Sequence, residues 1–281
     1  MSDSNSKERD LFQSTISSEK YSAYRIPYPN ELPEKIVSIL SKKRKPPHTL
    51  ALDVACGTGL GTRILAKHFQ RVIGLDISET QIAEATAIES SPNVTYQVCA
   101  AHSLPVDSNS VDLVTVATAI QWLDLETFYP EIDRVLKPGG CLMVYGCTSR
   151  SMKYHYKDKS GALTKLYNDT LYDTYIDYWT YRKPLQWNHY RDLPLPYKEN
   201  ERDDSMSMKD EVTVDDVIGY TSSLSFFEKY EQDHSDADRL LQDLQNRIMD
   251  ILDVKTAPDK TVVGREFPLF LVSSRKPSEI T

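Results

Sequence analysis

The feature that most constrains the fold is an apolar run that breaks into a glycine-rich turn. Residues 50–61 read LALDVACGTGLG, with glycine at three alternate positions after the apolar run. Such a run is typical of a strand buried on both faces of a parallel sheet. An amphipathic helix is predicted next, with Ile64, Leu65 and Phe69 on its apolar side. Glycines let a ligand approach the backbone, and a helix N-terminus offers N–H groups, so this segment predicts a nucleotide site.

Two acidic residues, and one position that departs from the dinucleotide-binding pattern, indicate which kind of nucleotide ligand the predicted site would bind. Asp53 lies inside the first strand, and a second predicted strand, residues 71–76, ends in Asp76, 17 residues after Gly59. A carboxylate at a strand end can accept hydrogen bonds from both ribose hydroxyls. The dinucleotide-binding pattern needs a further glycine at position 62, where this chain has Thr62.

Four motifs follow one another along residues 50–146: LDVACGTGLGT, VIGLDIS, SLPVDSNSVDLV, and RVLKPGG with an apolar strand after it. In this order they resemble the class I S-adenosylmethionine-dependent methyltransferases. Two shorter stretches, YSAYRIPYP at residues 21–29 and ATAIQWLD at residues 117–124, are similar to motifs of the small-molecule branch that includes trans-aconitate methyltransferase.

The resemblance implies an α/β fold with a seven-stranded, mostly parallel, doubly wound, Rossmann-like sheet. Strands alternating with helices predict the same arrangement, with right-handed crossovers. After the first two strands, the pattern predicts strands at residues 94–99, 111–117 and 141–147. Two closing strands, residues 261–267 and 269–274, are expected on either side of Pro268, the last of them antiparallel.

A helical, aromatic-rich insertion is expected after the fifth strand. Residues 150–200 hold nine of the 17 tyrosines, at spacings that give one helix an aromatic face. This face either packs on the core or forms a substrate pocket, and residues 198–211 are expected to form a charged loop. We therefore expect a disordered tail at residues 1–10 and a single methyltransferase domain at 11–281. Within this domain we expect an N-terminal arm at about 11–30, which is either a surface arm docked on the core or a lid over the cofactor. We also expect a substrate cap at about 150–230.

The resemblance also implies S-adenosylmethionine as cofactor and S-adenosylhomocysteine as product. The glycine turn would hold the methionine part, Asp76 the ribose, and Ala101 and His102 the adenine, while a guanidinium such as that of Arg25 suits the methionine carboxylate. The residues expected at the cofactor are Tyr21, Arg25, Asp53, Ala55, Cys56, Gly57, Thr58, Gly59, Asp76, Ile77, Ala101, His102 and Ala117.

Gln121 and Trp122 are the expected catalytic residues, bordering the methyl group. The branch has histidine where this chain has Gln121, which weakens any mechanism with a histidine base there. A carboxylate is ionised at pH 7 and needs no base, whereas an amine, phenol or hydroxyl usually does. We therefore expect O-methylation of a small carboxylic acid, paired with Arg25, Arg182 or Arg191. The alternatives are methylation of protein or RNA, and a non-catalytic S-adenosylmethionine-binding protein.

Charge and composition bear on partners and compartment. The formal net charge of −8 argues against a nucleic-acid partner, and no run of 18 apolar residues predicts a membrane helix. The basic run at residues 42–45 is expected to be a solvated helix end, with a targeting signal as the alternative. Four cysteines without a CxxC pair predict reduced thiols in a cytoplasmic protein and no metal site. A monomer or weak homodimer is expected.

Overall fold

The computed structural model describes residues 24, 26–88, 90–175 and 183–278. The chain forms two compact units. Unit 1 comprises Met1–Pro27, Thr148–Lys183 and Ser207–Pro268, and unit 2 comprises Tyr28–Cys147, Pro184–Met206 and Leu269–Thr281. The predicted tail and most of the predicted N-terminal arm lie outside the described residues.

Unit 2 is built on parallel strands that follow the predicted alternation with helices. The strands are β1 (His48–Val54), β2 (Phe69–Asp76), β3 (Val94–Val98), β4 (Val111–Ala117) and β5 (Leu136–Gly146). They are hydrogen-bonded in the order β3-β2-β1-β4-β5, and each neighbouring pair is parallel. The strand order reverses between β1 and β4, and ligands of such sheets bind at that point, beyond the carboxyl ends of the strands.

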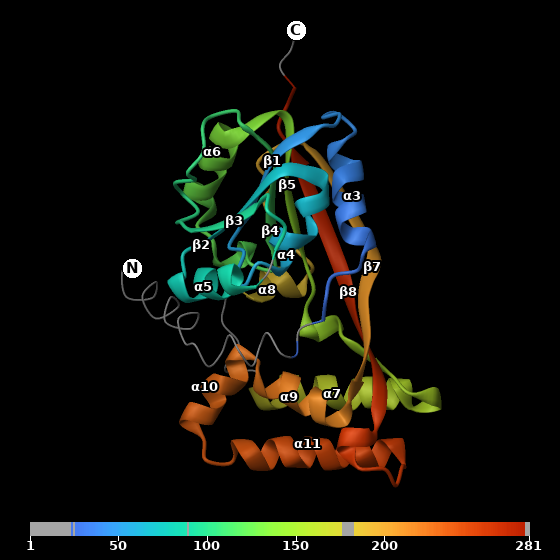
Figure 1. The fold of residues 1–281 in the computed structure, drawn as a ribbon. Coiled ribbons are helices and arrows are strands. Elements are labelled where there is room, and N and C mark those ends of the chain that lie inside the picture. Colours follow the sequence, from blue (N-terminus) through green and yellow to red (C-terminus); the bar gives the residue numbers. More distant parts are fainter. Residues whose placement is uncertain (1–23, 25, 89, 176–182, 279–281) are drawn as a thin grey trace. The chain divides into compact units, whose positions relative to one another are not determined.

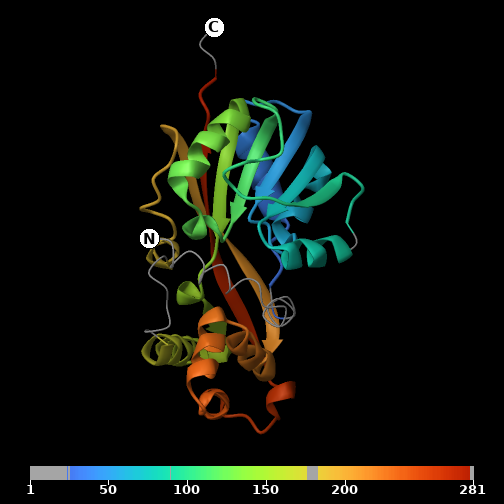
Figure 2. The ribbon, with the colours of Figure 1, turned by 90° about the vertical axis from the view of Figure 1, so that its left-hand side faces the viewer.

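Helices cover both faces of this sheet. They are α3 (Glu31–Leu40), α4 (Leu60–Ile64), α5 (Glu79–Ala87), α6 (Leu125–Val135) and α8 (Lys183–Trp187), with single 3₁₀ turns η1 (Ala66–His68) and η2 (Ile120–Trp122). Figures 1 and 2 show α3 and α6 on opposite faces, as the doubly wound prediction requires. The predicted cap of α5 is confirmed, since the Ser78 hydroxyl accepts a hydrogen bond from the N–H of Gln81.

Unit 1 holds the aromatic part of the chain. Its elements are β6 (Lys153–His155), α7 (Ser160–Tyr175), α9 (Val214–Ser222), α10 (Ser225–Asp233), α11 (Ala237–Leu252), and portions of β7 (Glu199–Thr213) and β8 (Val262–Arg275). The predicted amphipathic pattern of α7 is confirmed where its residues are described, because Leu163, Tyr167 and Leu171 are buried. Whether this unit caps a substrate stays a prediction.

Three expectations about the elements are wrong. Phe69 is not on a helix but begins β2, where it packs beside His48 of β1. The expected loop at 198–211 is strand β7, whose pairing with β8 satisfies its backbone while many of its charged side chains stay in solvent. The two closing strands are one strand, β8. Its pairing with β6 covers residues 264–266 and its pairing with β5 covers 270–275, so Pro268, which lacks an N–H, interrupts neither.

With β7 included, the sheet has eight strands instead of the expected seven. Five of them are the parallel strands of unit 2, and β8 is antiparallel to both β5 and β6. The sheet is therefore mostly parallel, as predicted, and β8 takes part in both of these antiparallel pairs.

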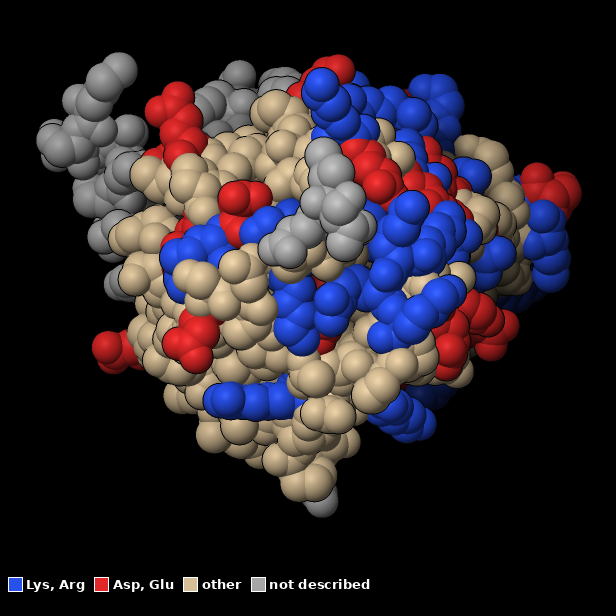
Figure 3. All heavy atoms as spheres, turned by 90° about the horizontal axis from the view of Figure 1, so that it is seen from above, with Lys and Arg blue, Asp and Glu red and all other residues tan. Residues whose placement is uncertain are grey.

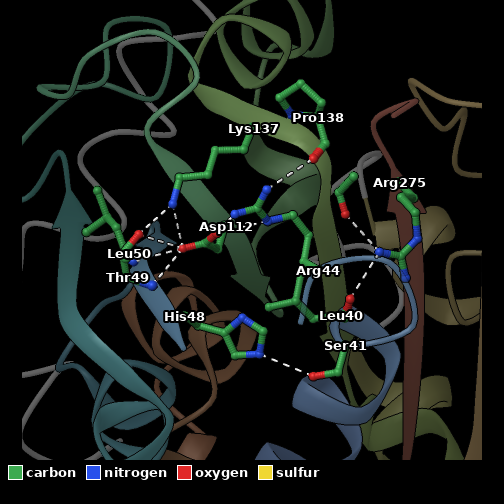
Figure 4. Close-up of polar contacts among 11 residues, drawn as sticks. Leu40, Ser41, Arg44, His48, Thr49, Leu50, Asp112, Lys137, Pro138 and Arg275 are labelled. Atoms are coloured by element: carbon green, nitrogen blue, oxygen red, sulfur yellow. Dashed lines mark hydrogen bonds and ion pairs between the residues drawn. The ribbon is translucent and has the colours of Figure 1, made fainter. Parts of the chain in front are cut away.

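A buried carboxylate ties together the amino ends of β1 and β4 in unit 2 (Figure 4). Asp112 accepts hydrogen bonds from the backbone N–H groups of Thr49 (2.7 Å) and Leu50 (3.2 Å). It also pairs with Arg44 (2.9 Å) and with Lys137 (2.9 Å). Two cations and two strand N–H groups thus converge on one side chain that is 1% exposed.

The basic run at residues 42–45 follows α3 directly and contributes to this region. Lys42 pairs with Glu201 at 2.6 Å, Arg44 pairs with Asp112, and Lys43 and Lys45 are exposed. Figure 3 shows Lys and Arg side chains gathered on the face seen from above, with Asp and Glu among them. These contacts agree with a solvated helix end.

Candidate functional site

The glycine turn leaves β1 through left-handed backbone. Ala55, Gly57 and Gly59 have φ angles of 55°, 54° and 78°. Glycine adopts this conformation without strain, whereas alanine there costs roughly 1–2 kcal/mol. The N–H of Gly57 donates to the Asp76 carboxylate at 2.8 Å, which fixes the turn to the end of the neighbouring strand.

Asp76 lies at the carboxyl end of β2, beside the turn. Its second oxygen accepts a hydrogen bond from the N–H of Ser78 at 2.9 Å, and the N–H of Ile77 also stabilises the charged carboxylate. Three backbone donors do not use all the lone pairs of a carboxylate. Burial raises the pKa of this carboxyl, and the backbone N–H groups of Ser78 and Gly57 oppose the rise. Ile77, which follows it, is 54% exposed and offers an apolar surface.

Asp53 lies inside the sheet and is fully buried. Its two oxygens accept hydrogen bonds from the hydroxyls of Thr62 (2.7 Å) and Thr115 (2.8 Å), two residues that sequence reasoning did not include in the site. Burial raises its pKa to about 6 despite these bonds. Asp53 therefore supports the turn from behind and has no exposed surface of its own.

Tyr96 of β3 is another residue that the sequence did not reveal. A methyl group built on Gly59 would lie 2.4 Å from the Tyr96 hydroxyl, and one built on Gly74 would lie 2.5 Å from a Tyr96 ring carbon. Arg63 donates to both the Thr58 carbonyl (2.8 Å) and the Tyr96 hydroxyl (3.2 Å). The ring thus fills the space left by two glycines and braces the turn.

The remaining expected cofactor residues lie at the same edge of the sheet. In the turn, Cys56 is buried and Thr58 is half-buried. In the loop after β3, Ala101 is half-buried and His102 is exposed. Ala117 is the last residue of β4. Burial raises the pKa of the Cys56 thiol, so it stays protonated. The structure therefore brings the described members of the set to the carboxyl ends of β1, β2, β3 and β4.

Gln121 and Trp122 follow β4 in η2. The Gln121 amide donates to the Thr118 carbonyl (3.0 Å), and its oxygen accepts a hydrogen bond from the Tyr190 hydroxyl (2.8 Å). Tyr190 is 1% exposed, packs edge-on against Phe270, and has a pKa well above its ordinary value because it is buried. Both ends of the Gln121 amide are therefore held, while Trp122 is half-buried beside it.

Several expected residues are placed elsewhere or not described. Tyr21, Arg25 and Arg182 lie outside the described residues. Arg191 is exposed and pairs with Asp204 at 2.9 Å, so this candidate partner for an acidic substrate already has an acid beside it. Within the described ranges, no cluster of three or more His, Cys, Asp or Glu side chains could hold a metal ion. No described helix is long and apolar enough to cross a membrane.

Comparison with known proteins places this chain in one family. Residues 52–144 match a family model described as a methyltransferase domain. A protein of Dictyostelium discoideum named as a methyltransferase is 30% identical over 92% of this chain and 93% of its own length. The malonyl-[acyl-carrier protein] O-methyltransferase of Herminiimonas arsenicoxydans is 33% identical over 38% of this chain and 40% of its own. The solved structure of a protein from Anaeromyxobacter dehalogenans that is described as a type II methyltransferase shares the fold, with a TM-score of 0.73, 23% identity, and coverage of 90% of this chain and 99% of that one.

The residues at the carboxyl edge fit the cofactor of this family. A glycine turn brings the backbone within reach of a ligand, and the Asp76 oxygens keep lone pairs for ribose hydroxyls. The Dictyostelium relative matches over nearly its whole length, and the family model covers the same strands and turn. The chain therefore belongs to the class I S-adenosylmethionine-dependent methyltransferases and is an enzyme that takes its methyl group from S-adenosylmethionine.

Proposed function

We propose that this enzyme O-methylates the carboxylate of a small organic acid, as expected of the branch that includes trans-aconitate methyltransferase. S-adenosylmethionine, when bound, would supply a sulfonium methyl group whose carbon forms a bond to the acceptor oxygen while its bond to sulfur breaks, which releases S-adenosylhomocysteine. The protein then has two tasks, which are to hold the acceptor oxygen near that methyl group and to exclude water. Whether it must also remove a proton depends on the acceptor.

The observation that carries this proposal is the fixed amide of Gln121. An amide does not titrate, and both its oxygen and its nitrogen already have partners in Thr118 and Tyr190. The Tyr190 hydroxyl cannot serve as the base either, because burial keeps its pKa well above its ordinary value. An acceptor at this position must therefore arrive already deprotonated, and a carboxylate does so at neutral pH.

The cofactor contacts that we propose follow from the same edge of the sheet. The turn from Ala55 to Gly59 would hold the methionine part, and Asp76 would accept hydrogen bonds from the ribose hydroxyls. Ile77, Ala101 and His102 would flank the adenine, and Ala117 would lie under the sulfonium. The second hydrogen on the Gln121 amide nitrogen is available to the acceptor oxygen.

The partial match to malonyl-[acyl-carrier protein] O-methyltransferases supports an oxygen acceptor. The matched segment spans 38% of this chain and 40% of that relative. We infer that the acceptor is a small free molecule. We also infer that the enzyme is a cytoplasmic monomer or weak homodimer. Because its formal net charge is −8, we infer no nucleic-acid or membrane partner.

Transfer from labelled S-adenosylmethionine tests the acceptor class. We expect label in a panel of small carboxylic acids and not in the matched alcohols or primary amines. Initial rates should change less than about twofold between pH 6.5 and 8.5, since a carboxyl group with a pKa of about 4 stays ionised throughout. Label in RNA or protein, or a rate that rises tenfold per pH unit, would contradict the proposal. Cofactor binding without transfer to any of these acceptors would favour a non-catalytic role.

A further inference from the structure

Strand β3 forms an open edge of the sheet in unit 2. It pairs with β2 on one side, and no other strand of the described part of the chain pairs with its second side. An edge strand presents a row of unpaired N–H and C=O groups to any strand that can reach it. Proteins usually protect such an edge with charged residues, proline or a bulge.

The sequence of β3 carries none of these protections. The strand reads VTYQV, without a charged residue or a proline, and its register with β2 runs from Val94 to Val98 without a shift. Valine, threonine and tyrosine are favoured in strands. Thr95, Gln97 and Val98 are exposed, and the 44% exposure of Val98 is high for a large apolar side chain. The strand is therefore well suited to pair with another strand.

The bonds between β2 and β3 show which backbone groups of β3 point outward. Just after the strand, the N–H of Cys99 donates to the Asp76 carbonyl at 2.8 Å. The direction of the backbone groups alternates along a strand, so those of Val94, Tyr96 and Val98 point away from β2. Among the described residues, no hydrogen-bond partner lies at the outward N–H groups of Tyr96 and Val98.

The residues of β3 are arranged almost symmetrically about Tyr96. If two copies of the strand pair antiparallel about this residue, Tyr96 lies opposite itself, Val94 opposite Val98, and Thr95 opposite Gln97. The outward N–H and C=O groups of Tyr96 then bond to those of Tyr96 in the second copy, and the Val98 N–H donates to the Val94 carbonyl. Apolar residues face apolar residues, polar face polar, and no charges meet. A two-fold interface requires such self-complementarity.

We propose that the enzyme forms a homodimer through β3, in which the sheets of two copies join antiparallel at this edge. A second copy is favoured over an unrelated strand because side-chain pairing and hydrogen bonding both match about one two-fold axis at Tyr96. The contact is short, so we expect weak association, with a dissociation constant of about 10–500 μM. The interface would include the strand whose Tyr96 ring braces the glycine turn. The dimer does not depend on which acceptor is methylated.

Sedimentation velocity of the full chain, at concentrations up to about 1 mM, tests for the dimer. The average sedimentation coefficient of the wild type should rise with concentration from that of a monomer toward that of a dimer. Two double variants then test the register. The lysine variant carries Thr95→Lys and Gln97→Lys, and the glutamate variant carries Thr95→Glu and Gln97→Glu. Both positions are exposed, so both variants should melt within about 3 °C of the wild type.

Each variant by itself should associate at least about tenfold more weakly than the wild type, because the proposed register places like charges directly opposite each other. An equimolar mixture of the two should form heterodimers at least about tenfold more tightly than either forms homodimers, since each lysine then faces a glutamate. Ser108→Lys with Asn200→Lys is the matched control. It adds the same charge at two exposed positions of unit 2 outside β3 and should leave association within about twofold of the wild type.

Three results would overturn the proposal. The first is a wild type that sediments as a monomer at every concentration. The second is a lysine variant that associates as well as the wild type, which would place the contact on another surface. The third is a mixture of the two variants that stays monomeric while the wild type dimerises, which would refute the antiparallel register about Tyr96. Titration with S-adenosylhomocysteine should give affinities within about twofold in all these proteins, because neither Thr95 nor Gln97 belongs to the cofactor edge.

Discussion

Replacing Asp112 by asparagine should lower the free energy of unfolding, because Asp112 is a buried carboxylate with two cationic partners. Burial alone raises the pKa of this carboxyl, but hydrogen bonds from Lys137, Thr49 and Leu50 bring it from 3.8 to about 2. A lowering of about 1.8 corresponds to ~2.4 kcal/mol in favour of the charged folded form, at ~1.36 kcal/mol per pKa unit. Asparagine keeps an oxygen for one strand N–H but turns an amide nitrogen toward donors.

The full loss should therefore be about 2–4 kcal/mol. Removing one partner of a buried ion pair costs about 3–5 kcal/mol, and the lower part of that range applies because the two cations can partly turn to solvent. The side chains of Arg44 and Lys137 are 30% and 18% exposed. Urea unfolding at pH 7, followed by far-ultraviolet circular dichroism, measures the difference between Asp112→Asn and the wild type.

The pH dependence of this difference has a definite sign. The folded pKa of Asp112 lies below its unfolded value, so its stabilising contribution is complete above about pH 4 and is lost as pH falls toward about 2. The gap between variant and wild type should thus be constant from pH 7 to 5 and shrink at lower pH. Asp107→Asn, at an exposed acid, is the control and should change stability by less than about 0.5 kcal/mol. An Asp112→Asn variant as stable as this control at pH 7 would refute the reasoning.

Three further predictions concern the cofactor edge. Asp76→Ala should weaken S-adenosylhomocysteine binding at least about tenfold in calorimetry, because it removes the ribose acceptor and frees the turn at Gly57; unchanged affinity would remove this assignment. Gly74→Ala should lower the free energy of unfolding by about 1–3 kcal/mol, since its methyl group would meet the Tyr96 ring at 2.5 Å. The double variant Gly74→Ala with Tyr96→Ala should lose less stability than the sum of the two single variants, because the clash is then removed. Asp53→Asn should raise the free energy of unfolding at pH 8 by up to ~3 kcal/mol. The pKa of Asp53 is about 6 in the folded protein and 3.8 in the unfolded chain, so ionisation of this carboxyl destabilises the folded state as pH rises between these values. That gain should shrink toward pH 4, and a variant that is less stable than the wild type at pH 8 would contradict the assigned burial effect.

The parts of the fold that the sequence predicted are those with a local signal. The apolar run before Gly57, the acid at the end of β2 and the Ser78 cap each depend on a few neighbouring residues, and each is confirmed in position. Strand β7 gave no such signal. Its charged sequence is typical of a loop, and only its pairing with β8, far along the chain, makes it a strand.

The residues that complete the site were missed for the same reason. Tyr96 supports the turn because β3 places it opposite Gly74 of β2, and a single sequence does not give that register. Tyr190 reaches Gln121 from 69 positions away. Thr62 is the exception, because its place in the glycine-rich motif drew attention, although only the structure shows its hydrogen bond to Asp53.

On the proposed function, in which the acceptor lies beside Gln121, the contact between Tyr190 and Gln121 would limit which acceptors the enzyme could acquire by mutation. An imidazole introduced at position 121 would receive the Tyr190 O–H bond on its only basic nitrogen, so it would gain a ring without gaining a free proton acceptor. A change of chemistry toward alcohols or amines at this position would then require two coupled substitutions, histidine at 121 and loss of the hydroxyl at 190. Neither substitution by itself is expected to let the enzyme methylate acceptors that are not already ionised at neutral pH.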